Sequence, residues 1–546
     1  MSPKEVQFSI ERATALYQRL DEFLFDETRE FTVECALTSS AVPFAKRPQK
    51  PFLHLQTGDR WGEKGQNAWF RLTGIVPPNW HGKYMACRIN LGGELLLLDA
   101  KGTILCGLTN TCIAAKNFNK DLLHFPQGVQ AARLELWVDA IASGLFIDGD
   151  GRFLNPGIVK SACYGLFREN IWQLKNDLEV ALSMLNIPCA TDSLANCREV
   201  FPKGSFRYNQ IAAALNEVTA LFHYNPEQAD LARNILKKRI LGIKNTSSAM
   251  KTTAVGHGHL DIGWLWTVPE TRRKAARTFS SQLALIQRYP DYVFGASQAQ
   301  LYNFVEENHP ELFKQIQKAV KAGRWEVQGG TWVEMDCNLA SGESLCRQFL
   351  YGKNYFRDKF DVNIRVFWLP DVFGYPGSLP QIAKLAGSDY FVTQKLCWNR
   401  QNRFPYSTFH WTGIDGTSIL TTFPPGDTYN ATLLPNELAY GADNNNENTV
   451  CSEFLSLFGT GDGGGGPKEE YIERGLRCRD LEGVPRVKFG KAEDFFRRIA
   501  RMNPRFPSWH GELFLEMHHG TYTSQAKIKW GNRRCEQTLQ QTEILF

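Results

Sequence analysis

The sequence predicts an α/β protein in which a barrel-like (β/α) domain follows an N-terminal β-sandwich domain and a helical connecting block. Three changes of pattern support this fold class. From about residue 30 to 160, short strand-like runs are broken by Gly, Pro and Asn. From about 165 to 245, apolar residues recur at helical spacing, and from about 250, apolar runs alternate with amphipathic helices. We therefore expect an N-terminal domain, mostly β-sandwich, at 1–164, a helical connector at 165–248, a barrel-like domain at 249–510, and its last strand with the start of a helical bundle at 511–546.

The composition excludes a disordered chain and disfavours nucleic acid as a partner. Of the 546 residues, 43% are hydrophobic and 12% aromatic, which is enough to bury a large core. Disordered chains have fewer aromatic residues and more unbalanced charge. The 62 Lys and Arg residues stand against 57 Asp and Glu, so the net charge of +5 creates no strong field that would attract phosphates.

The sequence also predicts a cytoplasmic protein that does not enter a membrane. Residues 1–30 mix charges throughout and lack the apolar segment and cleavage site of a signal peptide. No uncharged apolar stretch reaches the roughly eighteen residues that span a bilayer. The 13 cysteines are scattered, odd in number and without a C-x-x-C pair, as is typical of reduced thiols in the cytosol.

The elements of the first two regions follow from their periodicity. Residues 8–24 have apolar side chains at helical spacing, which predicts a short amphipathic helix. The strand-like runs of the β region are 68–76, 83–91, 94–108 and 132–140, and the helices expected after it are 166–185, 208–223 and 226–243. Asn225-Pro226 separates the last two helices, because this pair stops one helix and starts the next.

At least four strand–helix units follow from about residue 250, and this alternation predicts a parallel sheet covered by helices. In a barrel of this kind, the side chains at the carboxyl ends of the strands build the functional site. The basic cluster Arg272-Arg273-Lys274 lies on the first of these helices, where we expect a solvent-exposed face. The expected strands and helices alternate as 252–261, 272–289, 292–297, 300–323, 325–336, 341–360, 364–374, 378–387 and 390–397.

The first strand of the α/β region ends in a candidate metal half-site. Because side chains alternate along a strand, His257, His259 and Asp261 project to the same side. An imidazole nitrogen and a carboxylate oxygen two residues apart can bind one divalent ion. The alternative is a pair of surface polar residues, but the apolar strand before them and the aromatic segment Trp264–Trp266 after them favour the metal half-site.

Two later units each place an acidic residue just past a strand. Asp336 and Asp371 are about one βα repeat apart, so their carboxylates can face each other across a pocket. Glycoside hydrolysis needs such a pair, one as nucleophile or base and the other as acid. The alternative role for either residue is helix capping, for which Asp is common.

The segment 512–520 has an apolar core that ends in His518 and His519. It is a candidate for the last strand, which would bring an imidazole back towards His259 and Asp261 and, with Asp336, complete a four-ligand site. The pattern alone gives this step little support, because a terminal histidine is usually an ordinary polar residue.

With these residues in place, the chain resembles glycoside hydrolase family 38, the retaining α-mannosidases, and within it the cytosolic and bacterial branch. The resemblance runs from about 250 to 535 in ordered motifs, and the upstream β and helical regions are also similar to that branch. The motifs are GHGHLDIGWLW, GGTWVEMDCNLASGESL, WLPDVFGYPGSLPQI, FPYSTFHWTGIDG, GTGDGGGGP and ELFLEMHHGTYTSQ.

The resemblance implies a zinc ion, or another divalent ion such as cobalt, bound by His259, Asp261, Asp336 and His518. It implies that Asp336 is also the catalytic nucleophile and Asp371 the general acid/base. In related enzymes the metal contacts the 2- and 3-hydroxyls of mannose, a vicinal diol that includes the axial hydroxyl distinguishing this sugar.

For the sugar itself, the resemblance implies two further contacts. Trp264 matches the aromatic residue that packs against the mannose in the −1 subsite, and Asp462 of the glycine-rich segment is a candidate contact to a hydroxyl. From composition alone that segment is a flexible loop, and it lacks the Gly-Lys-Ser/Thr of a phosphate-binding loop.

The expected activity is therefore that of a retaining exo-α-mannosidase that acts on mannose-containing oligosaccharides through a mannosyl–enzyme intermediate. The carboxyl groups of Asp336 and Asp371 should then lie about 5–5.5 Å apart. The alternatives are a metal-dependent deacetylase or amidohydrolase on a similar barrel, and an inactive sugar-binding remnant.

Relatives of this family continue beyond the point that corresponds to Phe546 into a helical bundle and large β domains, which often assemble an oligomer. We therefore expect the chain to be the front part of a longer, homo-oligomeric protein.

Overall fold

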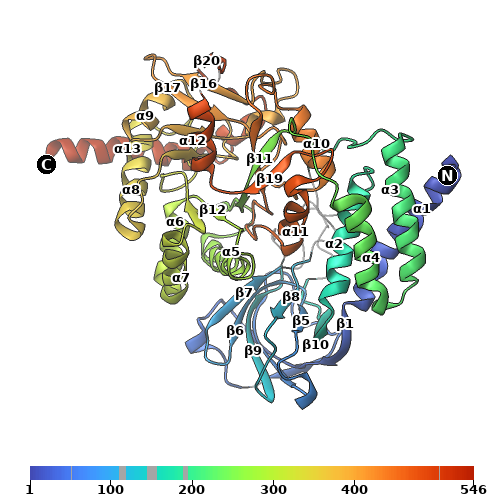
Figure 1. Cartoon of the computed structure of the whole chain (residues 1–546). Helices are drawn as coiled ribbons and strands as arrows, with labels where there is room; N and C mark the ends of the chain where they lie inside the picture. Colours follow the sequence, from blue (N-terminus) through green and yellow to red (C-terminus); the bar gives the residue numbers. More distant parts are fainter. Residues whose placement is uncertain (51, 110–118, 144–155, 189–194, 503–504) are drawn as a thin grey trace.

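The computed structural model describes residues 1–50, 52–109, 119–143, 156–188, 195–502 and 505–546. In Figure 1 the β-sandwich lies at the bottom, the helices α1–α4 lie at the right, and the α/β part lies above the sandwich. Of the cysteines in the sequence, Cys112 and Cys189 lie outside the described residues.

Two antiparallel sheets form the N-terminal sandwich that the sequence predicts. Within the described residues, one sheet has the order β1-β10-β5-β8 and the other β3-β2-β4-β9-β6-β7. Buried side chains such as Phe70, Val138 and Tyr164 fill the space between them, since alternate residues of each strand face inwards. The strands are β1 (Phe25–Glu30), β2 (Thr32–Thr38), β3 (Leu53–Leu55), β4 (Asn67–Ile75), β5 (Met85–Asn90), β6 (Glu94–Asp99), β7 (Ile104–Leu108), β8 (Leu122–Phe125), β9 (Arg133–Ile141) and β10 (Ser161–Phe167).

Four helices pack together beside the sandwich. The first begins with a capping box, in which the Ser2 hydroxyl accepts from the Glu5 backbone N–H and the Glu5 carboxylate accepts from the Ser2 N–H. Its apolar face is buried, as its helical periodicity predicts. The helices are α1 (Pro3–Arg19), α2 (Glu169–Ser183), α3 (Phe206–Phe222) and α4 (Ala229–Leu236).

The third part alternates strands and helices, and most of its strand pairs are parallel, as predicted. In the described chain, β11 pairs in parallel with β12, β18 and β19, and β14, β15 and β17 form a second parallel run to which β16 and β20 are added. The strands are β11 (Lys251–His257), β12 (Phe294–Ala296), β13 (Trp325–Val327), β14 (Val366–Trp368), β15 (Tyr390–Val392), β16 (Thr408–Thr412), β17 (Ser418–Thr422), β18 (Glu453–Phe458), β19 (Arg486–Phe489) and β20 (Ser508–His510).

The helices of this part cover the two sheets (Figure 1). They are α5 (Val268–Arg288), α6 (Ala299–Asn308), α7 (Pro310–Lys321), α8 (Gly342–Phe360), α9 (Leu379–Leu385), α10 (Pro435–Asp443), α11 (Glu469–Arg477) and α12 (Ala492–Met502), followed by the C-terminal α13 (Ala526–Leu545).

The predicted barrel is not closed by hydrogen bonds among the described residues, because the strands form two sheets. The sheets meet between β13 and β14, where the Gly329 N–H donates to the Val366 carbonyl over 3.0 Å. Gly329 and Gly330 both have positive φ, so the chain turns away directly after the three-residue strand β13. The strands within each sheet are still mostly parallel, so the loops that follow their carboxyl ends leave at the same edge of the sheet. The candidate site residues lie on these loops.

The segment 512–519 forms less strand than we predicted. Leu513 makes one antiparallel bridge with Tyr375, each N–H donating to the other carbonyl over 2.9 Å. The pairing ends at this bridge, and His518, five residues later, has a left-handed backbone with φ of 65°. The last strand of this region is β20, which pairs with β16.

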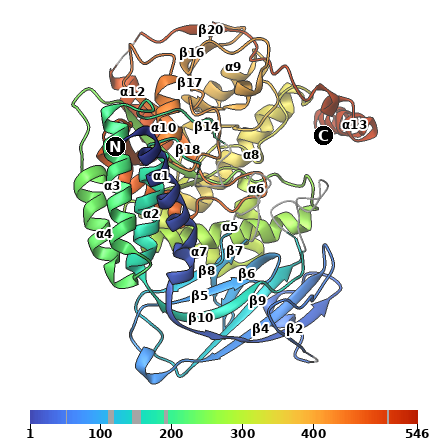
Figure 2. The same ribbon diagram turned by 90° about the vertical axis from the view of Figure 1, so that its right-hand side faces the viewer.

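Helix α13 extends away from the rest of the chain (Figures 1 and 2). Its exposed apolar side chains include Ile528, Trp530 and Leu539. None of the described helices is both long and apolar enough to cross a bilayer.

The basic cluster on α5 is buried, which corrects our prediction of a solvent-exposed face. The Lys274 ammonium is fully buried and donates to both carboxylate oxygens of Glu94 over 2.9 Å, and Arg273 donates to Asp139 over 2.6 Å. Only Arg272 is at the surface, paired with Glu307. Both acidic partners of the buried pair come from the sandwich, so sequence reasoning along α5 alone did not reveal them.

These contacts predict unequal effects of two neighbouring substitutions. Lys274→Met removes one of the two cations that contact the buried Glu94 carboxylate, which keeps Arg277, and should destabilise the first unfolding transition by about 1–3 kcal/mol. Arg272→Met is the matched control, because its exposed ion pair contributes less than about 1 kcal/mol. Urea unfolding of both variants measures the difference, and equal midpoints would show that the buried cluster does not hold the domains together.

Candidate functional site

The candidate site begins where β11 ends. This strand is buried along almost its whole length, and the chain leaves it through Gly258, to which the backbone of Gly466 lies too close for a side chain. His259 follows with its side chain only 3% exposed. The next residues are tied to the glycine-rich segment, because Leu260 bridges Gly463 and the Asp261 N–H donates to the Asp462 carbonyl over 2.9 Å.

The His259 imidazole is surrounded by carboxylates. Its Nδ1 lies 2.9 Å from Glu334 Oε2, and its Nε2 lies 3.5 Å from Asp261 Oδ1 and 3.7 Å from Asp371 Oδ2. Burial opposes a charge on this ring, but Glu334 and Asp261 hold the pKa of His259 well above its usual value. The site therefore favours a positive charge at this imidazole.

Asp371 is held by a buried cation. The Lys395 ammonium, whose side chain is 4% exposed, donates to Asp371 Oδ1 and lies over the ring of Trp398 at 3.9 Å. Asp371 is therefore held between the Lys395 ammonium on one oxygen and the His259 imidazole on the other.

Asp462 has a different environment. Its carboxylate accepts a hydrogen bond from the Tyr429 hydroxyl, and the ring of Tyr429 packs on His259 with centroids 5.3 Å apart. Burial raises the pKa of Asp462 to about 6, with His259 acting in the opposite direction and Asp371 adding to the rise. Its backbone has φ of 65°, which fixes the direction of the side chain at a small cost in strain.

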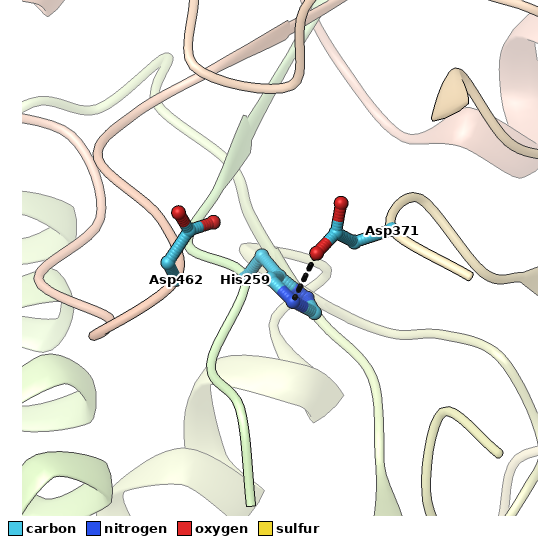
Figure 3. Close-up of side chains that lie close together, drawn as sticks. All are labelled: His259, Asp371 and Asp462. Carbon is cyan, nitrogen blue, oxygen red and sulfur yellow. Dashed lines mark ion pairs between the residues drawn. The ribbon is translucent and has the colours of Figure 1, made fainter. Parts of the chain in front are cut away.

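A divalent cation fits this arrangement. One ligand atom each from His259, Asp371 and Asp462 lie within 4.8 Å of one another (Figure 3). Nδ1 of His259 faces Glu334 and Nε2 faces carboxylate oxygens of Asp261 and Asp371, so positive charge at Nε2, whether a proton or a metal cation, would be stabilised there. One imidazole nitrogen with carboxylate oxygens is a donor set that zinc and similar ions accept.

Asp336 does not belong to this group of atoms. Its side chain is exposed, and Oδ1 accepts the backbone N–H groups of Asn338 and Leu339 over 2.7 and 2.8 Å. These bonds close a turn rather than cap a helix, because helix α8 begins at Gly342 and is capped by Ser341, so the alternative role of helix capping is not seen for Asp336. Its role as nucleophile or metal ligand stays a prediction.

His518 is also outside the group, although it lies near it. Its ring packs between Phe373 and Trp398, at centroid distances of 4.7 and 5.6 Å. Burial lowers the pKa of His518, Lys395 lowers it further and Asp371 opposes the change. Its neighbour His519 instead contacts the Leu515 carbonyl through Nε2 at 2.9 Å.

A carboxylate anchors the segment that carries His518. Glu516 accepts the backbone N–H groups of Arg400, Gln401 and Asn402 over 2.8 to 2.9 Å. The segment is thereby tied to the loop that follows Lys395, so His518 and Asp371 are held on neighbouring loops.

The two other residues singled out on β11 and after it differ in exposure. Trp264 is 51% exposed, and its ring meets that of Trp266 edge to face, so a broad aromatic surface remains accessible. His257 is buried against Trp368 at 5.1 Å, and burial lowers the pKa of His257 to about 3, so its ring is neutral. Its position fits packing rather than metal binding.

Sequence reasoning missed three residues of this site. Glu334 is two positions before Asp336 in the same motif, so its alternation with Asp336 was a usable signal. Lys395 and Tyr429 follow β15 and β17, but nothing in the local pattern marks a single lysine or tyrosine as part of a site. Both act through contacts with residues far along the chain.

Two family models match the chain. Residues 249–512 match the glycosyl hydrolases family 38 N-terminal domain, and residues 29–176 match the α-mannosidase jelly roll domain. The second match covers most of the described sandwich, and the first covers the α/β part from β11 to β20.

Curated relatives match along most of the chain. "Alpha-mannosidase G" of Dictyostelium discoideum is 37% identical over 91% of this chain and 45% of its own length. "Alpha-mannosidase 2C1" of Mus musculus is 34% identical over 96% of this chain and 49% of its own length. "Alpha-mannosidase" of Saccharomyces cerevisiae is 32% identical over 90% of this chain and 46% of its own length. The chain thus spans about half the length of the relatives it matches, and over its α/β part it belongs to glycosyl hydrolase family 38, behind a jelly roll domain of the α-mannosidase type.

Proposed function

We propose that this chain carries the catalytic part of a retaining exo-α-mannosidase that removes terminal α-linked mannose from oligosaccharides with the help of a divalent cation. The observation that carries the proposal is the His259 imidazole, whose Nε2 faces the carboxylates of Asp261 and Asp371 in a glycoside hydrolase domain. The names of the relatives support mannose as the sugar.

The resemblance assigns the cation to His259, Asp261, Asp336 and His518, whereas the grouped ligand atoms are those of His259, Asp371 and Asp462. His259 is common to both sets. A bound cation would supply positive charge that binds the vicinal 2- and 3-hydroxyls of mannose and favours the flattened ring of the transition state. Trp264 would pack against the apolar face of the same sugar ring.

The chain's own carboxylates would carry the covalent steps. Asp336 attacks the anomeric carbon while a second carboxyl group protonates the departing oxygen, and a mannosyl–aspartate ester forms. The second group then takes a proton from water, which hydrolyses the ester with net retention. A carboxyl separation of about 5–5.5 Å between the two groups stays a prediction of this mechanism.

Two residues are candidates for the proton donor, Asp371 from the resemblance and Asp462 from the geometry. Asp371 accepts a hydrogen bond from the buried Lys395 ammonium, so one of its oxygens is already engaged. Asp462 contacts the Tyr429 hydroxyl instead, an uncharged partner that is compatible with a protonated carboxyl. The geometry therefore favours Asp462 as the group that holds and transfers the proton, because burial raises its pKa to about 6, while Asp371 is bonded to Lys395 beside His259.

The remaining proposals concern the whole protein. We infer that its substrates are mannose-containing oligosaccharides, that it acts in the cytoplasm, and that the longer protein to which this chain corresponds is a homo-oligomer. The names of the relatives support the first, and the pattern of cysteines supports the second.

Hydrolysis of an aryl α-mannoside tests the activity. The wild-type protein should release mannose, and a chelator should abolish the release until zinc is restored. Asp336→Ala should lower kcat by at least about 10³-fold, because no glycosyl ester can form. Asp415→Ala is the matched control, since Asp415 is an exposed aspartate that likewise accepts a backbone N–H, from Thr417, away from the cluster.

Each alternative gives a different result in this assay. Undiminished mannose release by Asp336→Ala would exclude Asp336 as the nucleophile. Acetate release from acetylated sugars would indicate the deacetylase, and mannose binding without turnover by the folded protein would indicate a sugar-binding remnant.

The leaving group identifies the proton donor. A dinitrophenyl leaving group needs no proton, so a variant without the donor should retain cleavage of dinitrophenyl α-mannoside while losing about 10²- to 10⁴-fold on an alkyl mannoside. We expect this contrast in Asp462→Asn. The same contrast in Asp371→Asn, with equal losses on both substrates in Asp462→Asn, would return the role to Asp371.

Metal binding can be measured without turnover. Zinc added to the metal-free protein should raise the melting temperature. A free zinc concentration of about 100 times the dissociation constant adds about 2.7 kcal/mol to the free energy of unfolding. His259→Ala should remove the shift, and His54→Ala, at an exposed position on β3, should not. Loss of the shift in Asp336→Asn and His518→Ala would support the ligands implied by the resemblance, whereas its loss in Asp371→Asn and Asp462→Asn would support the grouped set.

A further inference from the structure

A lysine of the N-terminal sandwich reaches the glycine-rich segment of the candidate site. Lys120 lies two residues before the start of β8. Its backbone is fixed by a two-way bridge with Thr109, in which the Thr109 N–H donates to the Lys120 carbonyl over 3.1 Å and the Lys120 N–H to the Thr109 carbonyl over 2.8 Å. Its side chain crosses to the α/β part, where the sandwich packs directly on α5 (Figure 1). The contact is close, since a methyl group on Gly107 of β7 would meet the Arg277 backbone at 2.3 Å.

The Lys120 ammonium makes two hydrogen bonds across this boundary. It donates to the Gly465 carbonyl over 2.7 Å and to the Ser281 hydroxyl over 3.0 Å. The same carbonyl accepts from Gln282 Nε2 over 2.8 Å, so its two strongest donors are one from the sandwich and one from α5. The Gly465 N–H in turn donates to the Thr278 hydroxyl over 2.8 Å.

The segment held in this way carries Asp462. It closes on itself through the N–H and carbonyl groups of Thr460 and Gly466, at 3.1 and 2.9 Å. Gly464, Gly465 and Gly466 have no side chains that could pack and hold the segment, and all three have positive φ, which favours glycine. The position of Asp462 therefore depends on backbone contacts of the segment, including those at Gly465 and the bond from the Gly464 N–H to the His259 carbonyl over 3.2 Å.

The ammonium is placed in an unusual way. Within the part of the chain that the structure describes, no carboxylate forms an ion pair with Lys120, and both acceptors of its ammonium are uncharged oxygens. Loss of water around this group lowers the pKa of Lys120 to about 7. A cation in such a place is costly, but it makes a stronger, charge-assisted bond to a carbonyl than a neutral donor would.

We propose that Lys120 is a positioning residue for the active site, through which the sandwich domain holds the glycine-rich segment and so sets the position of Asp462. This proposal rests on the proposed function in one respect, which is that Asp462 takes part in the hydrolysis of mannosides. It assigns the sandwich a part in catalysis, through one ammonium that touches no substrate.

Lys120→Met tests the proposal, because methionine has a similar length but cannot donate. We expect kcat for the alkyl mannoside to fall about 10- to 100-fold while KM changes less than threefold, since a misplaced catalytic group costs turnover. Lys101→Met is the control, an exposed lysine in the turn between β6 and β7 of the same domain, and it should behave as wild type.

A second measurement does not depend on turnover. Hydrogen–deuterium exchange of the peptide covering 460–466 should rise in Lys120→Met and stay unchanged in Lys101→Met. If the wild-type protein fails to hydrolyse mannosides, the proposed function fails, and this exchange measurement alone then decides the role of Lys120. A folded Lys120→Met variant with unchanged exchange and unchanged kcat would overturn the proposal.

Lys120→Arg provides a variant that keeps the charge. Arginine keeps its proton up to about pH 12. Both proteins should lose kcat as Asp462 ionises, but only the wild type should show a further fall between pH 7 and 9 as Lys120 loses its proton. Superimposable pH profiles of the two proteins would contradict the proposal, and this comparison holds even if Lys120→Met does not fold. The groups that face Lys120 from the surrounding elements are Cys106, Glu94, Lys274, Arg277, Lys468 and Glu470.

Discussion

The site depends on one electrostatic constraint, a buried imidazole that carboxylates surround. His259 needs a positive charge at Nε2, because Asp261 and Asp371 both face this nitrogen while Glu334 holds the other. Four loops must therefore meet at one point, since these residues follow β11, β13 and β14 and Asp462 follows β18. Parallel strands achieve this convergence, because their carboxyl ends share one edge. The catalytic proposal, the choice of cation and the two candidates for the proton donor all follow from this arrangement.

Neighbouring carboxylates in this site have different partners, and the partners set their chemistry. An ammonium contacts Asp371, a phenol contacts Asp462, and backbone N–H groups contact Asp336. Of the three, the buried Asp462 has its pKa raised, to about 6. Three aspartates that look equivalent in the sequence therefore have different surroundings, and the proposed division of roles among them rests on that difference.

The fold could be predicted further from the sequence than the site could. Period-two and helical patterns identified the sandwich, the helices beside it and the strand–helix alternation, because these patterns reflect which side of an element is buried. His259 and Asp261 were found for the same reason, as they follow a buried strand. The pattern did not reveal Glu334, Lys395 or the buried state of Lys274, since each depends on a partner from a distant segment. The last strand was misplaced because only Leu513 of the predicted segment finds a partner, Tyr375, which lies in a distant segment.

The buried ion pairs between the sandwich and α5 have a consequence for modularity. If the two domains were separated, Glu94 would lose Lys274 and Asp139 would lose Arg273. Each separated domain would then carry unpaired charges on the surface that had been buried. The α/β part is therefore a poor unit for transplantation, although a family model matches it by itself. An engineer who grafts this catalytic part onto another scaffold would have to bring the sandwich with it, or rewrite the surface of α5. In evolutionary terms, the two domains are expected to be inherited as a pair.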